Sequence, residues 1–74
     1  SIQYYPYVPS TLKKDAKYEL FYWNNGWKSG GVQKCNGQYI TFKNIPQGTL
    51  YRLKEESSKN ERIFTWENGL IYWM

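Results

Sequence analysis

Residues 17–27 read KYELFYWNNGW, and this stretch decides the fold class. A run rich in aromatic, β-forming side chains ends at Asn24-Asn25-Gly26, and an aromatic residue, Trp27, follows the turn signal. Asn and Gly tolerate the positive φ that a tight turn between antiparallel strands requires. The stretch therefore predicts a strand, a turn and the start of a second strand.

Similar turn signals divide the rest of the chain into short segments. They stand at Asn36-Gly37, Ile45-Pro46-Gln47-Gly48 and Asn68-Gly69, with a polar loop over residues 55–60. The sequence between them predicts strands over 27–35, 38–44, 49–54, 61–67 and 70–74. Such spacing is typical of all-β folds, so we expect an antiparallel sandwich or small barrel of five to seven short strands joined by Asn-Gly hairpins.

Gly30-Gly31 falls inside the second expected strand. Glycine weakens strand pairing there, but it permits a bulge or a sharp coil that bends a sheet onto itself. A close approach by a ligand is the alternative explanation.

The first 16 residues differ from the remainder. Pro6 and Pro9 lie among tyrosines, and proline fixes φ and removes a donor from a strand ladder. We expect an extended Pro/Tyr-rich lead-in or interdomain junction over 1–16 and an antiparallel β domain over 17–74, with a Pro-rich ligand motif as the alternative for the lead-in. Since the chain starts at Ser1 without Met and ends in an apolar strand, we expect a C-terminal piece of a longer protein.

Packing has to stabilise a chain of this composition. The 74 residues contain one cysteine and no histidine, so an internal disulfide and a structural zinc site are excluded. Aromatic residues make up 20% of the chain, and a few buried rings can replace many aliphatic side chains. The net charge of +4 is spread along the chain, and no apolar stretch is long enough to span a membrane.

The sequence offers no catalytic machinery. Its six acidic residues lie mostly in predicted turns or at strand ends, and no histidine is present to activate Cys35. No Gly-rich phosphate loop precedes a helix. We therefore expect a protein that is not an enzyme and that has no catalytic residues, no metal site and no cofactor.

Several expected strands are apolar on both alternating faces, and no helix is predicted to cover the second face. Three explanations stay open. The chain forms a tight barrel or sandwich with rings around its edges, the parent protein covers one face, or some rings are exposed and bind a ligand.

The candidate ligand-binding residues are Trp23 and Trp27, which flank one turn, and Trp66 and Trp73, which flank another. Such rings either pair across a hairpin for stability or form a platform. A platform suits carbohydrate, or single-stranded nucleic acid if basic residues lie beside it. The basic candidates are Lys28, Lys34, Lys43 and Arg52. Because these charges are dispersed, nucleic acid ranks below carbohydrate or protein contact.

One set of short segments comprises Tyr18–Trp23, Gly26-Trp27, Ile45-Pro46, Leu50-Tyr51, 61–65 and 67–69. This set resembles a small C-terminal β-module of secreted or lipoprotein-type proteins of anaerobic gut bacteria. That module often lies behind a transglutaminase-like domain, and the resemblance covers residues 17–74. It implies a non-catalytic accessory role in an exported protein, at the cell surface, in the periplasm or secreted. Its partner would be the upstream domain of the same polypeptide, and Cys35 matches no catalytic residue of such a domain.

Overall fold

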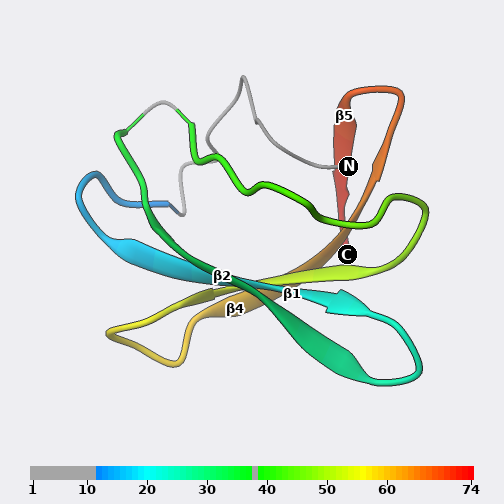
Figure 1. The fold of residues 1–74 in the computed structure, drawn as a ribbon. Helices are drawn as coiled ribbons and strands as arrows, with labels where there is room; N and C mark the ends of the chain where they lie inside the picture. Colours follow the sequence, from blue (N-terminus) through cyan, green and yellow to red (C-terminus); the bar gives the residue numbers. More distant parts are fainter. Residues whose placement is uncertain (1–11, 38) are drawn as a thin grey trace.

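The computed structural model describes residues 12–37 and 39–74 and shows five antiparallel strands in one sheet (Figure 1). The strands are β1 (Lys17–Trp23), β2 (Trp27–Lys34), β3 (Tyr51–Glu55), β4 (Glu61–Glu67) and β5 (Leu70–Trp73). Their order across the sheet is β2-β1-β3-β4-β5, so β2 and β5 are edges and the sheet does not close. The all-β antiparallel class is thus confirmed, and the finer prediction of a sandwich or barrel is not. Residues 1–11 of the expected lead-in lie outside the described residues.

Two of the connections are tight turns between neighbouring strands. Asn68 and Gly69 have φ values of 53° and 79°, and Glu67 pairs with Leu70 across them. Trp23 pairs with Trp27 across residues 24–26, where Asn25 has a φ of 55°. In contrast, Asn36-Gly37 is not followed by a strand, so Asn-Gly hairpins throughout the chain are not confirmed.

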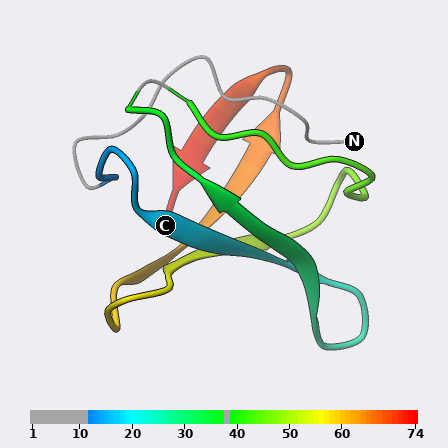
Figure 2. The same ribbon diagram turned by 60° about the vertical axis from the view of Figure 1, so that its left-hand side comes forward.

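The strand predicted over 38–44 is wrong, because residues 39–44 form no strand. Instead residues 39–50, here called the covering segment, run across one face of the sheet (Figures 1 and 2). Ile40, Phe42 and Ile45 are each only 1% exposed. The apolar alternation that predicted a strand therefore serves to bury side chains, without ladder pairing.

Hydrogen bonds fix the C-terminal half of the covering segment. The Tyr51 hydroxyl donates to the carbonyl of Pro46 at 2.6 Å, and the Thr49 hydroxyl donates to the carbonyl of Trp23 at 2.6 Å. The Trp23 N–H in turn donates to the carbonyl of Leu50 at 3.0 Å. The segment therefore enters β3 beside the end of β1, which explains why β3 pairs with β1.

The core lies between the sheet and the covering segment. The buried apolar residues are Tyr18, Leu20, Cys35, Ile40, Phe42, Ile45, Tyr51, Leu53 and Phe64. The Tyr51 and Phe64 rings stack with centroids 5.4 Å apart. Leu12 and Ala16, from the C-terminal end of the expected lead-in, pack against this core as partly buried residues.

A bulge in β2 brings the covering segment close to the sheet. The register between β1 and β2 shifts between Glu19 and Phe21, opposite the glycine pair, which confirms the expected irregularity. A Cβ on Gly30 would lie 2.5 Å from Cδ1 of Ile45. The close approach at Gly30 therefore comes from the covering segment.

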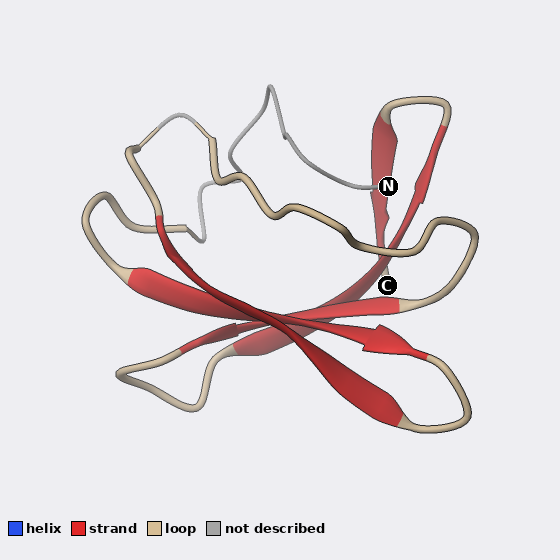
Figure 3. Cartoon of the chain, in the orientation of Figure 1, coloured by secondary structure: helices blue, strands red, loops and turns tan. Residues whose placement is uncertain are grey.

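The two faces of the sheet have different surroundings (Figure 3). The covered face carries the core residues of β1, β3 and β4. Because successive side chains alternate between faces, the register places Phe21, Trp23, Trp27, Arg52 and Ile63 together on the opposite side, here called the open face. No described segment crosses the open face (Figures 1 and 2).

Candidate functional site

Two of the four candidate tryptophans lie on each face of the sheet, and only Trp23 and Trp27 pair with each other in the strand register. Trp23 and Trp27 lie on the open face, with ring centroids 5.5 Å apart and an interplanar angle of 82°. Trp66 and Trp73 lie on the covered side and pack against the core as partly buried residues. The Trp73 centroid is 5.0 Å from that of Phe64. The four rings therefore make two separate surfaces and not one platform.

Arg52 lies at the centre of the aromatic part of the open face. Its guanidinium carbon is 4.5 Å from the Phe21 ring centroid and 4.9 Å from the Trp27 centroid. Contacts at this distance are cation–π interactions. Arg52 Nε is buried and makes no hydrogen bond to any described residue. The open face thus presents a partly buried cation, fixed between two rings, with unused hydrogen-bonding capacity.

Phe21 is a member of this cluster that sequence reasoning missed. Phe21, Trp27 and Arg52 come from β1, β2 and β3, and they meet because Phe21 pairs with Ser29 on one side and with Arg52 on the other. Only the strand order could have revealed this, since β1 is central between β2 and β3.

The charges on the open face have both signs. The register places Lys17, Lys34 and Lys54 there, together with Glu19, Glu61 and Glu67. Lys28 pairs with Tyr22 and so lies on the other side of β2, and Lys43 belongs to the covering segment. Of the four expected basic candidates, Lys34 and Arg52 thus lie on the open face and Lys28 and Lys43 do not, so the four form no continuous basic stripe beside the rings.

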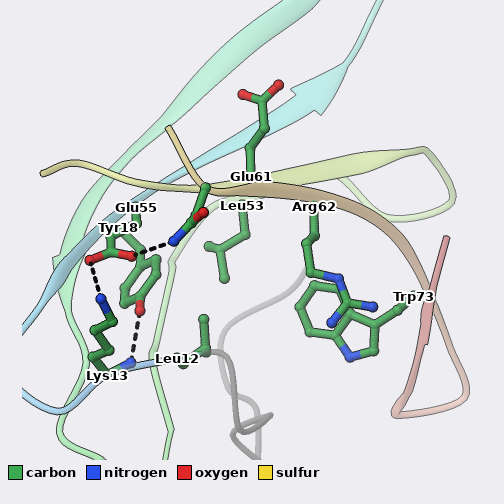
Figure 4. Close-up of a pocket in the computed structure, with 9 residues that line it drawn as sticks. Leu12, Lys13, Tyr18, Leu53, Glu55, Glu61, Arg62 and Trp73 are labelled. Atoms are coloured by element: carbon green, nitrogen blue, oxygen red, sulfur yellow. Dashed lines mark hydrogen bonds and ion pairs between the residues drawn. The ribbon is translucent and has the colours of Figure 1, made fainter. Parts of the chain in front are cut away.

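A pocket of about 350 Å³ opens on the covered side of the sheet (Figure 4). Its wall includes Leu12, Tyr18, Leu53, Glu55, Arg62 and Trp73. β3 and β4 provide Leu53, Glu55 and Arg62, and the edge strand β5 provides Trp73. The pocket thus joins an apolar and aromatic wall to several charged groups.

Glu55 is the buried polar residue of this pocket, with 3% of its surface exposed. Its carboxylate accepts hydrogen bonds from the Ser57 and Ser58 hydroxyls at 3.2 Å each and from Asn60 Nδ2 at 3.4 Å. Lys13 Nζ lies 3.6 Å from Glu55 Oε2. Burial on its own raises the pKa of Glu55, but the hydrogen bonds and the charge of Lys13 together place this pKa below its ordinary value. The carboxylate is therefore stabilised in its ionised form.

Tyr18 connects this network to the chain before β1. Its hydroxyl accepts a hydrogen bond of 2.8 Å from the backbone N–H of Lys13. Burial raises the pKa of Tyr18, and the nearby negative charge of Glu55 acts in the same direction. Tyr18 thus stays neutral and orients the turn that carries Lys13.

Stability should depend on pH through Glu55. Because the folded-state pKa lies below the ordinary value of 4.5, the carboxylate stabilises the fold above that pH, and this stability is lost as the pH falls through the folded pKa. We expect Glu55→Gln to reduce the difference in denaturant midpoint between neutral pH and about pH 3. Glu56→Gln, at the exposed neighbouring position, is the control and should keep the full difference. An unchanged difference in Glu55→Gln would contradict this role.

Arg62 lies over Trp73 at the pocket, with its guanidinium carbon 4.5 Å from the Trp73 ring centroid (Figure 4). Among residues 12–37 and 39–74, Lys13 forms an ion pair with Glu55. No carboxylate in these residues forms an ion pair with Arg62. Arg62 was not among the site residues expected from sequence. Nothing in the sequence around Arg62 predicts its contact with Trp73, which belongs to the neighbouring strand β5.

The described residues show no group of three His, Cys, Asp or Glu side chains that could hold a metal ion. Cys35 is a free thiol that is fully buried in the core. In the part of the chain that the structure describes, no helix is long and apolar enough to cross a membrane.

Comparison with known proteins found no relative. The chain matches no protein family model, no curated protein and no solved structure.

Proposed function

We propose that this chain is a non-catalytic accessory module that docks through its open face onto another domain of the same polypeptide. The observation that carries the proposal is Arg52, fixed between Phe21 and Trp27 with a buried Nε that makes no hydrogen bond to a described residue. An arginine held between two rings with an unsatisfied donor is costly to bury, and a docked surface would supply acceptors to the outer N–H groups of the same guanidinium.

The composition of the open face supports the same function. Tryptophan and arginine are the residues that most often dominate the energetics of protein interfaces. Trp23 is 46% exposed beside this cluster, and exposed Val32 and Tyr72 also lie on the open face. Strands that are apolar on both faces usually have cover on both sides, and the covering segment accounts for one side only. A docked domain would complete a layered packing around the sheet.

The partner that fits this surface presents a carboxylate or a backbone carbonyl to Arg52, with apolar side chains around it. The upstream domain of the same polypeptide is the proposed partner, since it would be tethered to this chain at high effective concentration. An exported parent protein, at the cell surface, in the periplasm or secreted, is part of this proposal, and it rests on the sequence resemblance alone.

Carbohydrate binding is less well supported by the geometry of the open face. A sugar stacks on a flat ring surface, but the Trp23 and Trp27 rings are nearly perpendicular. Arg52 also lies over the Trp27 ring. Trp23 is therefore the ring best placed for a sugar, and a glycan panel belongs in the test.

The experiment uses the parent polypeptide with a protease site introduced at the junction before this chain. After cleavage, we expect the two pieces to stay associated in size-exclusion chromatography, and calorimetry on the re-mixed pieces gives the Kd. Arg52→Gln should weaken this association at least about tenfold, because it removes an anchor of the interface.

Lys28→Gln is the matched control, since it removes one positive charge from an exposed residue outside the open face. It should leave the Kd unchanged. Pieces that separate freely, or an Arg52→Gln variant that is folded and binds like the unmodified chain, would contradict docking. Saturable binding of a glycan that Trp23→Ala abolishes would support the carbohydrate function in its place.

A further inference from the structure

The pocket on the covered side contains one guanidinium, that of Arg62, that forms no ion pair with a described carboxylate. Lys13 is paired with Glu55 at 3.6 Å. Glu61, which precedes Arg62 in β4 and also lines the pocket, is opposite Lys54 in the strand register, and its side chain points away from Arg62 (Figure 4). No carboxylate among the described residues pairs with Arg62. The lining as a whole has no net charge, because Lys13 and Arg62 stand against Glu55 and Glu61, but Arg62 is the cation left available to a ligand.

Arg62 is an exposed residue, and a contact with one aromatic ring favours one position of its guanidinium. The Arg62 guanidinium stacks on Trp73 at 4.5 Å, and Trp73 in turn contacts the buried Phe64 ring. A guanidinium that stacks through its face still has its edge N–H groups for hydrogen bonding. Arginine donates two parallel hydrogen bonds to a carboxylate in this way, and its planar fork loses less entropy for each hydrogen bond formed.

The rest of the pocket wall suits the apolar part of a ligand. Leu12, Leu53 and the Trp73 ring line a volume of about 350 Å³, as Figure 4 shows for these side chains. Small-molecule sites have volumes of about 300–1,000 Å³ and combine apolar walls with a few polar groups that fix orientation. The size corresponds to a ligand with a short apolar chain or a single ring.

The charges around the pocket also indicate whether a bound anion should carry one negative charge or two. The single positive charge of Arg62, which forms no ion pair with a described carboxylate, matches the single negative charge of a carboxylate. A phosphate dianion would leave excess negative charge close to Glu55, whose hydrogen bonds and ion pair keep it ionised. The pocket thus favours a monoanion over a dianion.

We propose that this pocket binds an organic carboxylate with an apolar or aromatic body, in which Arg62 holds the carboxylate and Leu12, Leu53 and Trp73 contact the body. The site lies on the side opposite the open face, so the proposal is independent of docking. Two sources share this chemistry, a free small acid and the C-terminal carboxylate of a peptide.

The test is an NMR titration of the 74-residue chain with 3-phenylpropionate and with its neutral amide. We expect saturable shifts of the Arg62 side chain and of the Trp73 indole N–H, and binding of the amide at least about tenfold weaker than that of the acid. Equal binding of acid and amide, shifts confined to the open face, or no saturation up to millimolar acid would each overturn the proposal.

Two variants separate a specific contact from general attraction to a basic protein. Arg62→Gln should weaken acid binding about tenfold or more, and Arg62→Lys should restore only part of it because lysine lacks the planar fork. Lys28→Gln, which removes a charge outside the pocket, should bind the acid like the unmodified chain. Equal weakening in Lys28→Gln and Arg62→Gln would overturn the proposal, and the comparison of acid with amide decides the question if a variant fails to fold.

The same titration distinguishes the two sources. A tripeptide that ends in a free Phe carboxylate is compared with its C-terminally amidated form. Binding of the free peptide as tightly as 3-phenylpropionate identifies a C-terminal peptide carboxylate as a ligand. Binding of 3-phenylpropionate alone restricts the site to small acids, and binding of neither overturns the proposal.

Discussion

Phe42→Ala should lower the free energy of unfolding by about 3–5 kcal/mol, although Phe42 belongs to no strand or helix. Phe42 is 1% exposed and lies in the core cluster with Ile40 and Ile45. Removing its ring deletes a large buried apolar surface and leaves a cavity between the covering segment and the sheet. The measurement is a urea or guanidinium unfolding curve followed by tryptophan fluorescence.

Lys43→Ala is the matched control, because Lys43 is the exposed neighbour of Phe42 in the same segment. Its effect should stay within about 0.5 kcal/mol. Such a small domain has little stability to lose, so Phe42→Leu provides a milder variant if Phe42→Ala is unfolded. A loss below about 1 kcal/mol for Phe42→Ala would mean that the covering segment is not part of the core.

Gly30→Ala should also destabilise the fold, by about 1–3 kcal/mol, through crowding. The added Cβ would lie 2.5 Å from Cδ1 of Ile45 and 3.4 Å from the carbonyl oxygen of Leu20. Ile45 is 1% exposed, so its side chain has little room to move away. Gly30 does not have the positive φ of its neighbour Gly31, so the expected cost comes from contact and not from backbone strain.

A double-mutant cycle tests this explanation. Ile45→Val removes the methyl group that the new Cβ would meet, so the double variant Gly30→Ala/Ile45→Val should be less destabilised than the sum of the single variants. We expect a coupling of about 1 kcal/mol between the two positions, measured from denaturant unfolding. Additive effects would show that Gly30 is required for a reason other than its contact with Ile45.

The candidate surfaces could be predicted only in part. The contact between Trp23 and Trp27 follows from sequence, since residues that flank a tight turn are neighbours, whereas Trp66 pairs with Ile71 and Trp73 with Phe64. The separation of these four tryptophans onto opposite faces could not be predicted without the pairing of each strand. Arg52 was a basic candidate from sequence and Arg62 was not, and only the sheet order placed both over aromatic rings of neighbouring strands.

The sequence by itself determined the local features of this protein. Asn25, Asn68 and Gly69 have the positive φ values that tight turns need, and the runs between the turns form strands near the expected bounds. These features depend on steric preferences of a few adjacent residues, so they can be read from a short stretch of chain.

Only the tertiary structure decided which apolar segments form strands of the sheet and which one becomes the covering segment. Residues 39–44 alternate between apolar and polar side chains like a strand. They form no strand, because β2 and β3 already pair with the two edges of β1, and Ile40 and Phe42 pack into the core. The pairing of β3 with β1 also brings Arg52 to Phe21 and Trp27. Such choices depend on competition between contacts far apart in the sequence, which no local pattern records.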